Sequence, residues 1–106
     1  MRNNRLNKLI KELNTRIAKD YSDFKGCYLY GSRVKKTHHQ DSDVDIVAIF
    51  DYIDRAKDLE IRGIVCELMY IYDVYIDFRT YTLEDLMKNP IYCDEVTKKG
   101  RFYDAA

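Results

Sequence analysis

The sequence predicts a small domain of the α/β class, in which amphipathic helices pack against a β-sheet. Apolar residues recur every three or four positions near the N-terminus, an uninterrupted apolar run, IVAIF, occupies residues 46–50, and apolar residues alternate with other residues over positions 73–78. The first pattern has the period of a helix, and the other two are typical of strands. Because 106 residues suffice for one hydrophobic core, we expect a single domain spanning residues 1–106.

The first half of the chain is expected to supply one helix and two strands. The helix covers about residues 4–19, and its apolar stripe consists of Leu6, Leu9, Ile10, Leu13 and Ile17. Residues 27–30 form a short strand that ends at Gly31, and residues 43–50 form a second strand. The continuous apolar run of this second strand implies burial on both faces, so we place it at the centre of the sheet.

The second half is expected to begin with a helix over residues 53–72, whose apolar positions have the helical period. A strand over residues 73–78 follows, with Asp77 on its exposed face. Two short helices, over residues 83–88 and 91–99, complete the chain, and Thr82 is the expected cap of the first.

Charge and cysteine content narrow the function classes. Eighteen Lys and Arg residues balance eighteen Asp and Glu residues, so no net field attracts the chain to nucleic acid or to an anionic membrane. The sequence contains no apolar run long enough to span a bilayer and no leader-like apolar segment. Cys27, Cys66 and Cys93 are widely spaced, which indicates reduced, mostly buried thiols. We expect a cytoplasmic protein with no direct nucleic-acid or membrane contact.

Two carboxylates stand at the start of the predicted central strand. Asp43 and Asp45 are two residues apart, so both point to the same face of the sheet, where their repulsion opposes folding. If Asp77 of the neighbouring strand joins them, the cluster suits Mg²⁺, which prefers a few carboxylates together with substrate phosphates, and does not suit zinc. Asp73 could replace Asp77 as the third carboxylate, although its position is more typical of a turn residue.

A second group of residues precedes the carboxylates and suits a polyphosphate. Gly31 ends a strand and allows close approach of a ligand, and Ser32 offers a hydroxyl beside unpaired backbone N–H groups. Arg33, Lys35 and Lys36 follow at once and can neutralise phosphate charge.

Other motifs fit this stretch less well. The sequence contains neither a P-loop nor a Rossmann glycine motif. Asp41, Asp43 and Asp45 imitate the start of a calcium loop, but Ile46 stands where the loop needs Gly and Tyr52 where it needs Glu. The adjacent His38 and His39 are expected to be solvated loop residues.

Gly31-Ser32, followed by Asp43-Val44-Asp45 and by Asp77 on a later strand, resembles the signature of the DNA polymerase beta nucleotidyltransferase superfamily. The short chain points to its minimal nucleotidyltransferase (MNT) branch. The resemblance implies a palm-like α+β fold, a small mixed sheet with helices packed on one face. It also implies that Asp43, Asp45 and Asp77 are the catalytic carboxylates that hold two Mg²⁺ ions, with Asp77 helping to activate the acceptor hydroxyl. Gly31 and Ser32 would hold the triphosphate.

The chain departs from the usual start of this signature, because Val34 and Lys36 stand where such domains have Ala and a second Gly. The resemblance implies transfer of AMP from ATP to a hydroxyl, typically a Tyr of a helical HEPN partner, an RNase toxin that the MNT chain counteracts as its antitoxin. One alternative is a non-catalytic, nucleotide-binding module that masks its partner. Another is a small-molecule transferase of the aminoglycoside-modifying kind, which would need a homodimer to form its pocket. Tyr92 and Tyr103 are the expected partner contacts.

Overall fold

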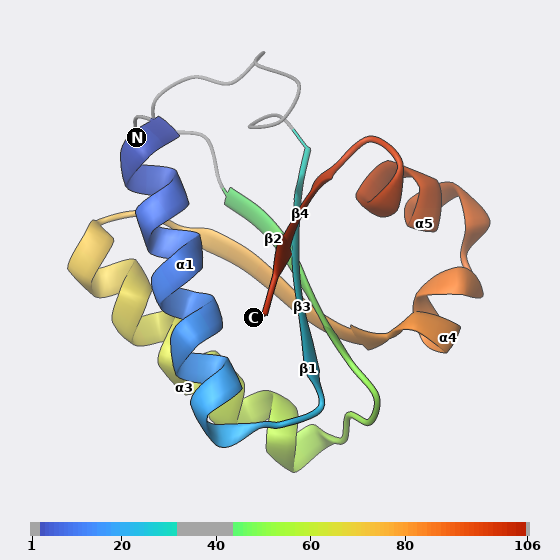
Figure 1. Ribbon diagram of the computed structural model, residues 1–106, viewed down its shortest axis with the longest axis horizontal. Helices are drawn as coiled ribbons and strands as arrows, with labels where there is room; N and C mark the ends of the chain where they lie inside the picture. Colours follow the sequence, from blue (N-terminus) through green and yellow to red (C-terminus); the bar gives the residue numbers. More distant parts are fainter. Residues whose placement is uncertain (1–2, 32–43, 106) are drawn as a thin grey trace.

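In the part of the chain that the structure describes, four strands form a mixed sheet with helices on both faces (Figure 1). The computed structural model describes residues 3–31 and 44–105. The strands are β1 (Phe24–Tyr30), β2 (Val44–Phe50), β3 (Ile76–Thr82) and β4 (Arg101–Asp104), in the spatial order β3-β2-β1-β4. β2 runs parallel to β3, whereas β1 is antiparallel to β2 and to β4. The predicted fold class is confirmed, and β2 lies inside the sheet as expected.

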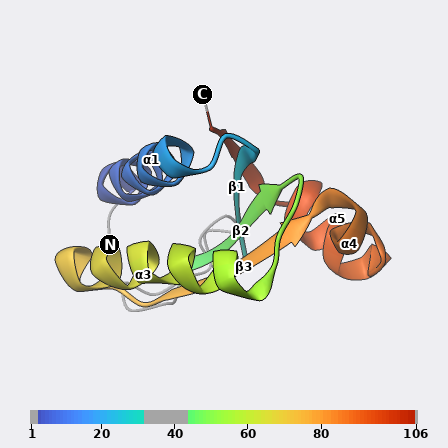
Figure 2. The same ribbon diagram turned by 90° about the horizontal axis from the view of Figure 1, so that it is seen from below.

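Two long helices cover one face of the sheet (Figure 2). These are α1 (Asn3–Asp20) and α3 (Arg55–Tyr72). The predicted apolar stripe of α1 is fully confirmed, because Leu6, Leu9, Ile10, Leu13 and Ile17 are all buried. With the inner residues of α3 and the facing sheet residues, this stripe forms the main hydrophobic core.

Two short helices, α4 (Leu83–Met87) and α5 (Pro90–Thr97), pack against the opposite face. The expectation of helices on one face therefore holds only for the long helices. The reason lies in β2, whose Val47 and Ile49 point away from α1 and α3 and still need cover. Leu86 of α4 and Val96 of α5 provide it.

The third strand begins later than predicted. Asp73 is the C-terminal cap of α3 in the left-handed conformation, with φ of 52°, so β3 starts only at Ile76 and continues to Thr82. Asp73 is thus the turn residue that its position suggested, and it is not a third carboxylate on the sheet. Thr82 caps α4 as predicted, accepting a hydrogen bond from the Asp85 N–H at 3.1 Å.

Two further features differ from expectation. The edge strand β4 was not predicted, because it is short and only one of its four residues is partly buried. The cysteines are free, but Cys66 is exposed and Cys93 half-buried, so only Cys27 fits the prediction of buried thiols. None of the described helices has the length and apolar character needed to cross a bilayer.

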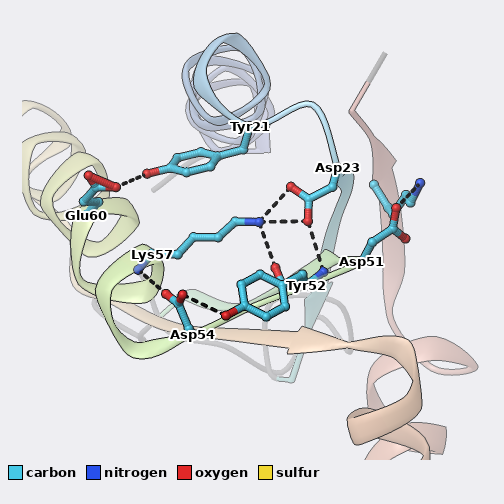
Figure 3. A network of polar contacts seen from close by, with 8 residues as sticks. Tyr21, Asp23, Asp51, Tyr52, Asp54, Lys57 and Glu60 are labelled. Atoms are coloured by element: carbon cyan, nitrogen blue, oxygen red, sulfur yellow. Dashed lines mark hydrogen bonds and ion pairs between the residues drawn. The ribbon is translucent and has the colours of Figure 1, made fainter.

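A largely buried lysine joins the elements at one end of the sheet (Figure 3). The Lys57 side chain is only 12% exposed, and its Nζ donates to both carboxylate oxygens of Asp23 at 2.7 and 2.8 Å. The same Nζ donates to the Tyr52 carbonyl at 2.8 Å and lies 4.7 Å from the centre of the Phe50 ring. A cation with this many partners compensates well for its removal from water.

The backbone around Lys57 is fixed by two more carboxylate contacts. Asp54 caps α3 by accepting from the Lys57 N–H at 2.8 Å, and Asp23 accepts from the Tyr52 N–H at 3.1 Å. The turn before β1, the end of β2 and the start of α3 are therefore held together, and we refer to Asp23, Tyr52, Asp54 and Lys57 as the lysine clasp.

Candidate active site

Two of the predicted carboxylates lie side by side at the other end of the sheet. Asp45 of β2 and Asp77 of β3 are partners in the parallel register, so both point to the same face. Alternation along β2 makes this the face on which Val47 and Ile49 contact α4 and α5. Adjacent strands are about 4.8 Å apart, which brings the two carboxylates within reach of one cation.

Gly31 lies directly against the Asp45 carboxylate. It follows the last residue of β1 with φ of 79°, a left-handed conformation that favours glycine. A Cβ atom at this position would lie only 2.5 Å from Asp45 Oδ2. The backbone conformation favours glycine, and a larger residue would also displace the Asp45 carboxylate. The structure thus brings together the glycine and the carboxylate that the sequence motif separates by 13 residues.

The remaining members of the predicted site lie outside the described residues. They are Ser32, Arg33, Lys35 and Asp43, together with Val34, Lys36, His38 and His39. Their proposed roles stay predictions.

Arg79 is a site residue that sequence reasoning missed. It lies two residues after Asp77 on β3 and therefore on the same face. Its Nε is 3.6 Å from Asp77 Oδ1, and its guanidinium carbon is 5.9 Å from the centre of the Tyr92 ring. The two-residue spacing of Asp77 and Arg79 on one strand could have indicated this residue. It was overlooked because the predicted strand stopped at residue 78, before Arg79.

Tyrosines from β1, β3 and α5 form one wall beside these charges. The Tyr30 and Tyr92 hydroxyls are 2.8 Å apart, and their rings meet edge to face at 5.8 Å. Tyr81 adds a third ring 6.0 Å from that of Tyr92. Burial and the hydrogen bond with Tyr92 raise the pKa of Tyr30 far above its ordinary value, so this hydroxyl stays neutral.

The two residues expected to contact a partner also make contacts within the chain. Tyr92 is half-buried in this wall, and Tyr103 donates a hydrogen bond to Asn7 Oδ1 at 2.7 Å. Neither tyrosine contributes a charge to the site, but the Tyr92 ring on α5 contacts Arg79.

The chemistry of the described donors fits magnesium. Asp45 and Asp77 offer hard oxygen atoms, and 39% of the Asp77 side chain is exposed, so substrate phosphates can complete a coordination shell. Within residues 3–31 and 44–105 no cluster of three metal-binding side chains occurs.

Comparison with known proteins identifies a matching family. The sequence model of the polymerase beta nucleotidyltransferase family matches residues 11–102. No curated protein matches the sequence significantly.

Similar solved structures come from toxin–antitoxin complexes. A toxin–antitoxin structure with AMP-PNP is 22% identical, with a TM-score of 0.60 over 87% of this chain and 70% of that one. The MntA-HepT complex is 18% identical, with a TM-score of 0.54 over 90% of this chain and 69% of that one. A complex of a tri-AMPylated Shewanella oneidensis HEPN toxin with an MNT antitoxin is 20% identical, with a TM-score of 0.52 over 87% and 70%. These likenesses show a shared fold.

Proposed function

The chain belongs to the polymerase beta nucleotidyltransferase family, and we propose on that premise that it transfers AMP from ATP to a hydroxyl group of a partner protein and releases pyrophosphate. The observation that carries the proposal is the placement of Asp45 and Asp77 in register on one sheet face, with Gly31 against the first of them. Such a carboxylate pair beside a glycine turn can hold metal ions and a triphosphate together.

The site residues divide into a metal-binding and a phosphate-binding group in this proposal. Asp43, Asp45 and Asp77 hold two Mg²⁺ ions, which when bound offset the negative charge on the transferred phosphoryl group. Gly31 and Ser32 hold the triphosphate, and Arg33 and Lys35 contribute positive charge.

Asp77 also accepts the proton of the acceptor hydroxyl. It is half-exposed, so an acceptor can approach it from solvent. A positioned carboxylate of this kind typically contributes a factor of about a hundred or more to the rate.

The acceptor we propose is a Tyr of a helical HEPN-type RNase toxin, with this chain as the antitoxin. The support comes from the structural neighbours, one of which pairs an MNT antitoxin with a tri-AMPylated HEPN toxin. Another neighbour contains the ATP analogue AMP-PNP, which favours ATP as the nucleotide.

Mass spectrometry of the chain co-expressed with its genomic neighbour, after incubation with ATP and Mg²⁺, tests this function. We expect one or a few AMP groups on a partner Tyr, and a loss of at least about a hundredfold in rate for Asp77→Asn. The control is Asp51→Asn, which removes an exposed carboxylate beyond the other end of β2 and should leave the rate unchanged.

The same experiment separates catalysis from masking. If the partner stays unmodified and is inhibited equally by the wild type and by Asp77→Asn, the transferase proposal is overturned, and the chain acts by covering its partner.

A further inference from the structure

A fixed cation stands beside the carboxylate that we propose as a metal ligand. Arg79 lies 3.6 Å from Asp77 through its Nε and approaches the ring of Tyr92 on its other side. A guanidinium group stays charged at every pH at which the protein is folded. Asp77 therefore has a permanent positive neighbour on its own strand.

The Arg79 guanidinium also contacts α5. Tyr92 presents its ring to the guanidinium, and this ring is itself held by the buried Tyr30 through the hydroxyl contact of 2.8 Å. Contacts therefore run from β1 through α5 to Arg79 on β3. A long side chain that is half-exposed would otherwise sample many rotamers, and the aromatic contact restricts it to the neighbourhood of Asp77.

The charges at this site have opposite consequences with and without metal. Without metal, Arg79 offsets the repulsion between Asp45 and Asp77 and so favours folding. With a divalent cation on the carboxylates, the same guanidinium lies within a few ångströms of a second positive charge and opposes binding.

We propose that Arg79 is a resident counter-cation that competes with the metal ion for Asp77 and is held in place by Tyr92 of α5. The inference rests on the metal site of the proposed function. It makes α5 a control element for metal affinity, because moving Tyr92 away releases the competing cation.

Titration of the free protein with Mn²⁺, followed by electron paramagnetic resonance, tests the competition without any catalysis. Arg79→Gln should bind Mn²⁺ about threefold to tenfold more tightly than the wild type, and in chelator it should melt at a lower temperature. If Arg79 were only structural, Arg79→Gln would lower the melting temperature without changing Mn²⁺ affinity. Arg79→Lys keeps the charge and should restore most of the wild-type behaviour.

Arg62 provides a matched control on the other face of the sheet. Its Nε is 2.7 Å from Asp58 Oδ2, and its guanidinium lies 5.9 Å from the centre of the Phe78 ring. Arg62→Gln thus removes the same kind of ion pair and ring contact, and should leave Mn²⁺ affinity unchanged.

Two variants of Tyr92 test the tether. Tyr92→Leu removes the ring and should raise Mn²⁺ affinity, but by less than Arg79→Gln does. Tyr92→Phe keeps the ring and should raise the affinity by less than Tyr92→Leu does. In the double variant with Arg79→Gln, Tyr92→Leu should add nothing to Mn²⁺ affinity.

The outcomes distinguish this inference from the proposed function. If the wild type binds Mn²⁺ in a way that Asp45→Asn abolishes, and Arg79→Gln binds no more tightly, the competition is wrong and the metal site stands. If neither the wild type nor Arg79→Gln binds Mn²⁺, the metal site and the competition are both overturned.

Discussion

The two ends of the sheet use charge in opposite ways. At the lysine clasp, a nearly buried cation meets a carboxylate at 2.7 Å. At the other end, Asp45 and Asp77 stand side by side as like charges, and the neighbouring cation Arg79 is 3.6 Å from Asp77 and half-exposed. The ion pair of the clasp is short and largely removed from water, whereas the pair of Asp77 with Arg79 is longer and open to solvent, so a ligand of opposite charge can reach the Asp77 carboxylate.

The largest effect should follow from breaking the lysine clasp. Lys57→Met leaves the Asp23 carboxylate, only 25% exposed, without its cation, and should lower the free energy of unfolding by about 3 kcal/mol. Urea titration measures this value. Lys25→Met is the control, because its pair with Asp51 is mostly exposed on both sides and should change stability by less than about 1 kcal/mol. Equal losses in the two variants would contradict the comparison.

The next effect should come from Gly31 at the opposite end. Gly31→Ala combines an unfavourable left-handed backbone with a Cβ atom 2.5 Å from Asp45 Oδ2, and should cost about 2 kcal/mol. Adding Asp45→Ala removes the clash but not the backbone strain, so the pair should recover roughly half of the loss.

Gly63→Ala is the control for this measurement. A Cβ at Gly63 meets nothing within 4 Å, and the residue lies inside α3, so the same substitution should stabilise the protein by about 0.5–1 kcal/mol. If Gly63→Ala also lowered the stability, the loss in Gly31→Ala could not be assigned to the limited space around Gly31.

Acidification should weaken the clasp. Burial alone would raise the pKa of Asp23, but hydrogen bonds from Lys57 and from the Tyr52 N–H outweigh it and lower the pKa below the ordinary 3.8. Because the folded-state pKa is the lower one, the stabilisation is complete above the unfolded pKa and is lost as pH falls through the folded pKa.

Urea titrations of the wild type and Asp23→Asn at several pH values check this dependence. The variant should be about 2 kcal/mol less stable near neutral pH, and the gap should narrow as pH falls below 3.8. A gap that stays constant down to acid pH would show that the carboxylate charge does not contribute.

The smallest effect on stability should come from Asp45→Asn. Replacing one of two like charges should leave the melting temperature in chelator unchanged or slightly higher, in contrast to Asp23→Asn. We expect Mg²⁺ with ATP to raise the melting temperature of the wild type by binding to the folded state, and the variant should lack this increase. A clear drop in chelator would assign Asp45 a structural role.

Periodic features of this protein were predictable from the sequence, and contacts between distant residues were not. The stripe of α1 and the two-sided burial of β2 follow from local apolar patterns. The parity of positions 45 and 77 also placed both carboxylates on one face, although the start of β3 was misplaced because Asp73–Phe78 alternates as a strand would.

The lysine clasp had no comparable signal. Asp23 and Lys57 are 34 residues apart, and a lone lysine near a helix start is usually solvated. Arg79 was missed for a related reason. Its contact with Tyr92 depends on the position of α5 on the second sheet face, which was not predicted.

The close fit between Gly31 and Asp45 has a consequence for how related sequences can vary. A side chain at the first position would have to adopt a left-handed backbone and displace the carboxylate oxygen at the second, so we expect relatives that keep the acid to keep the glycine. The two positions should therefore change together through evolution. Relatives that have lost both residues should keep the fold without the proposed activity. A sequence comparison of the two positions would identify such relatives without any assay.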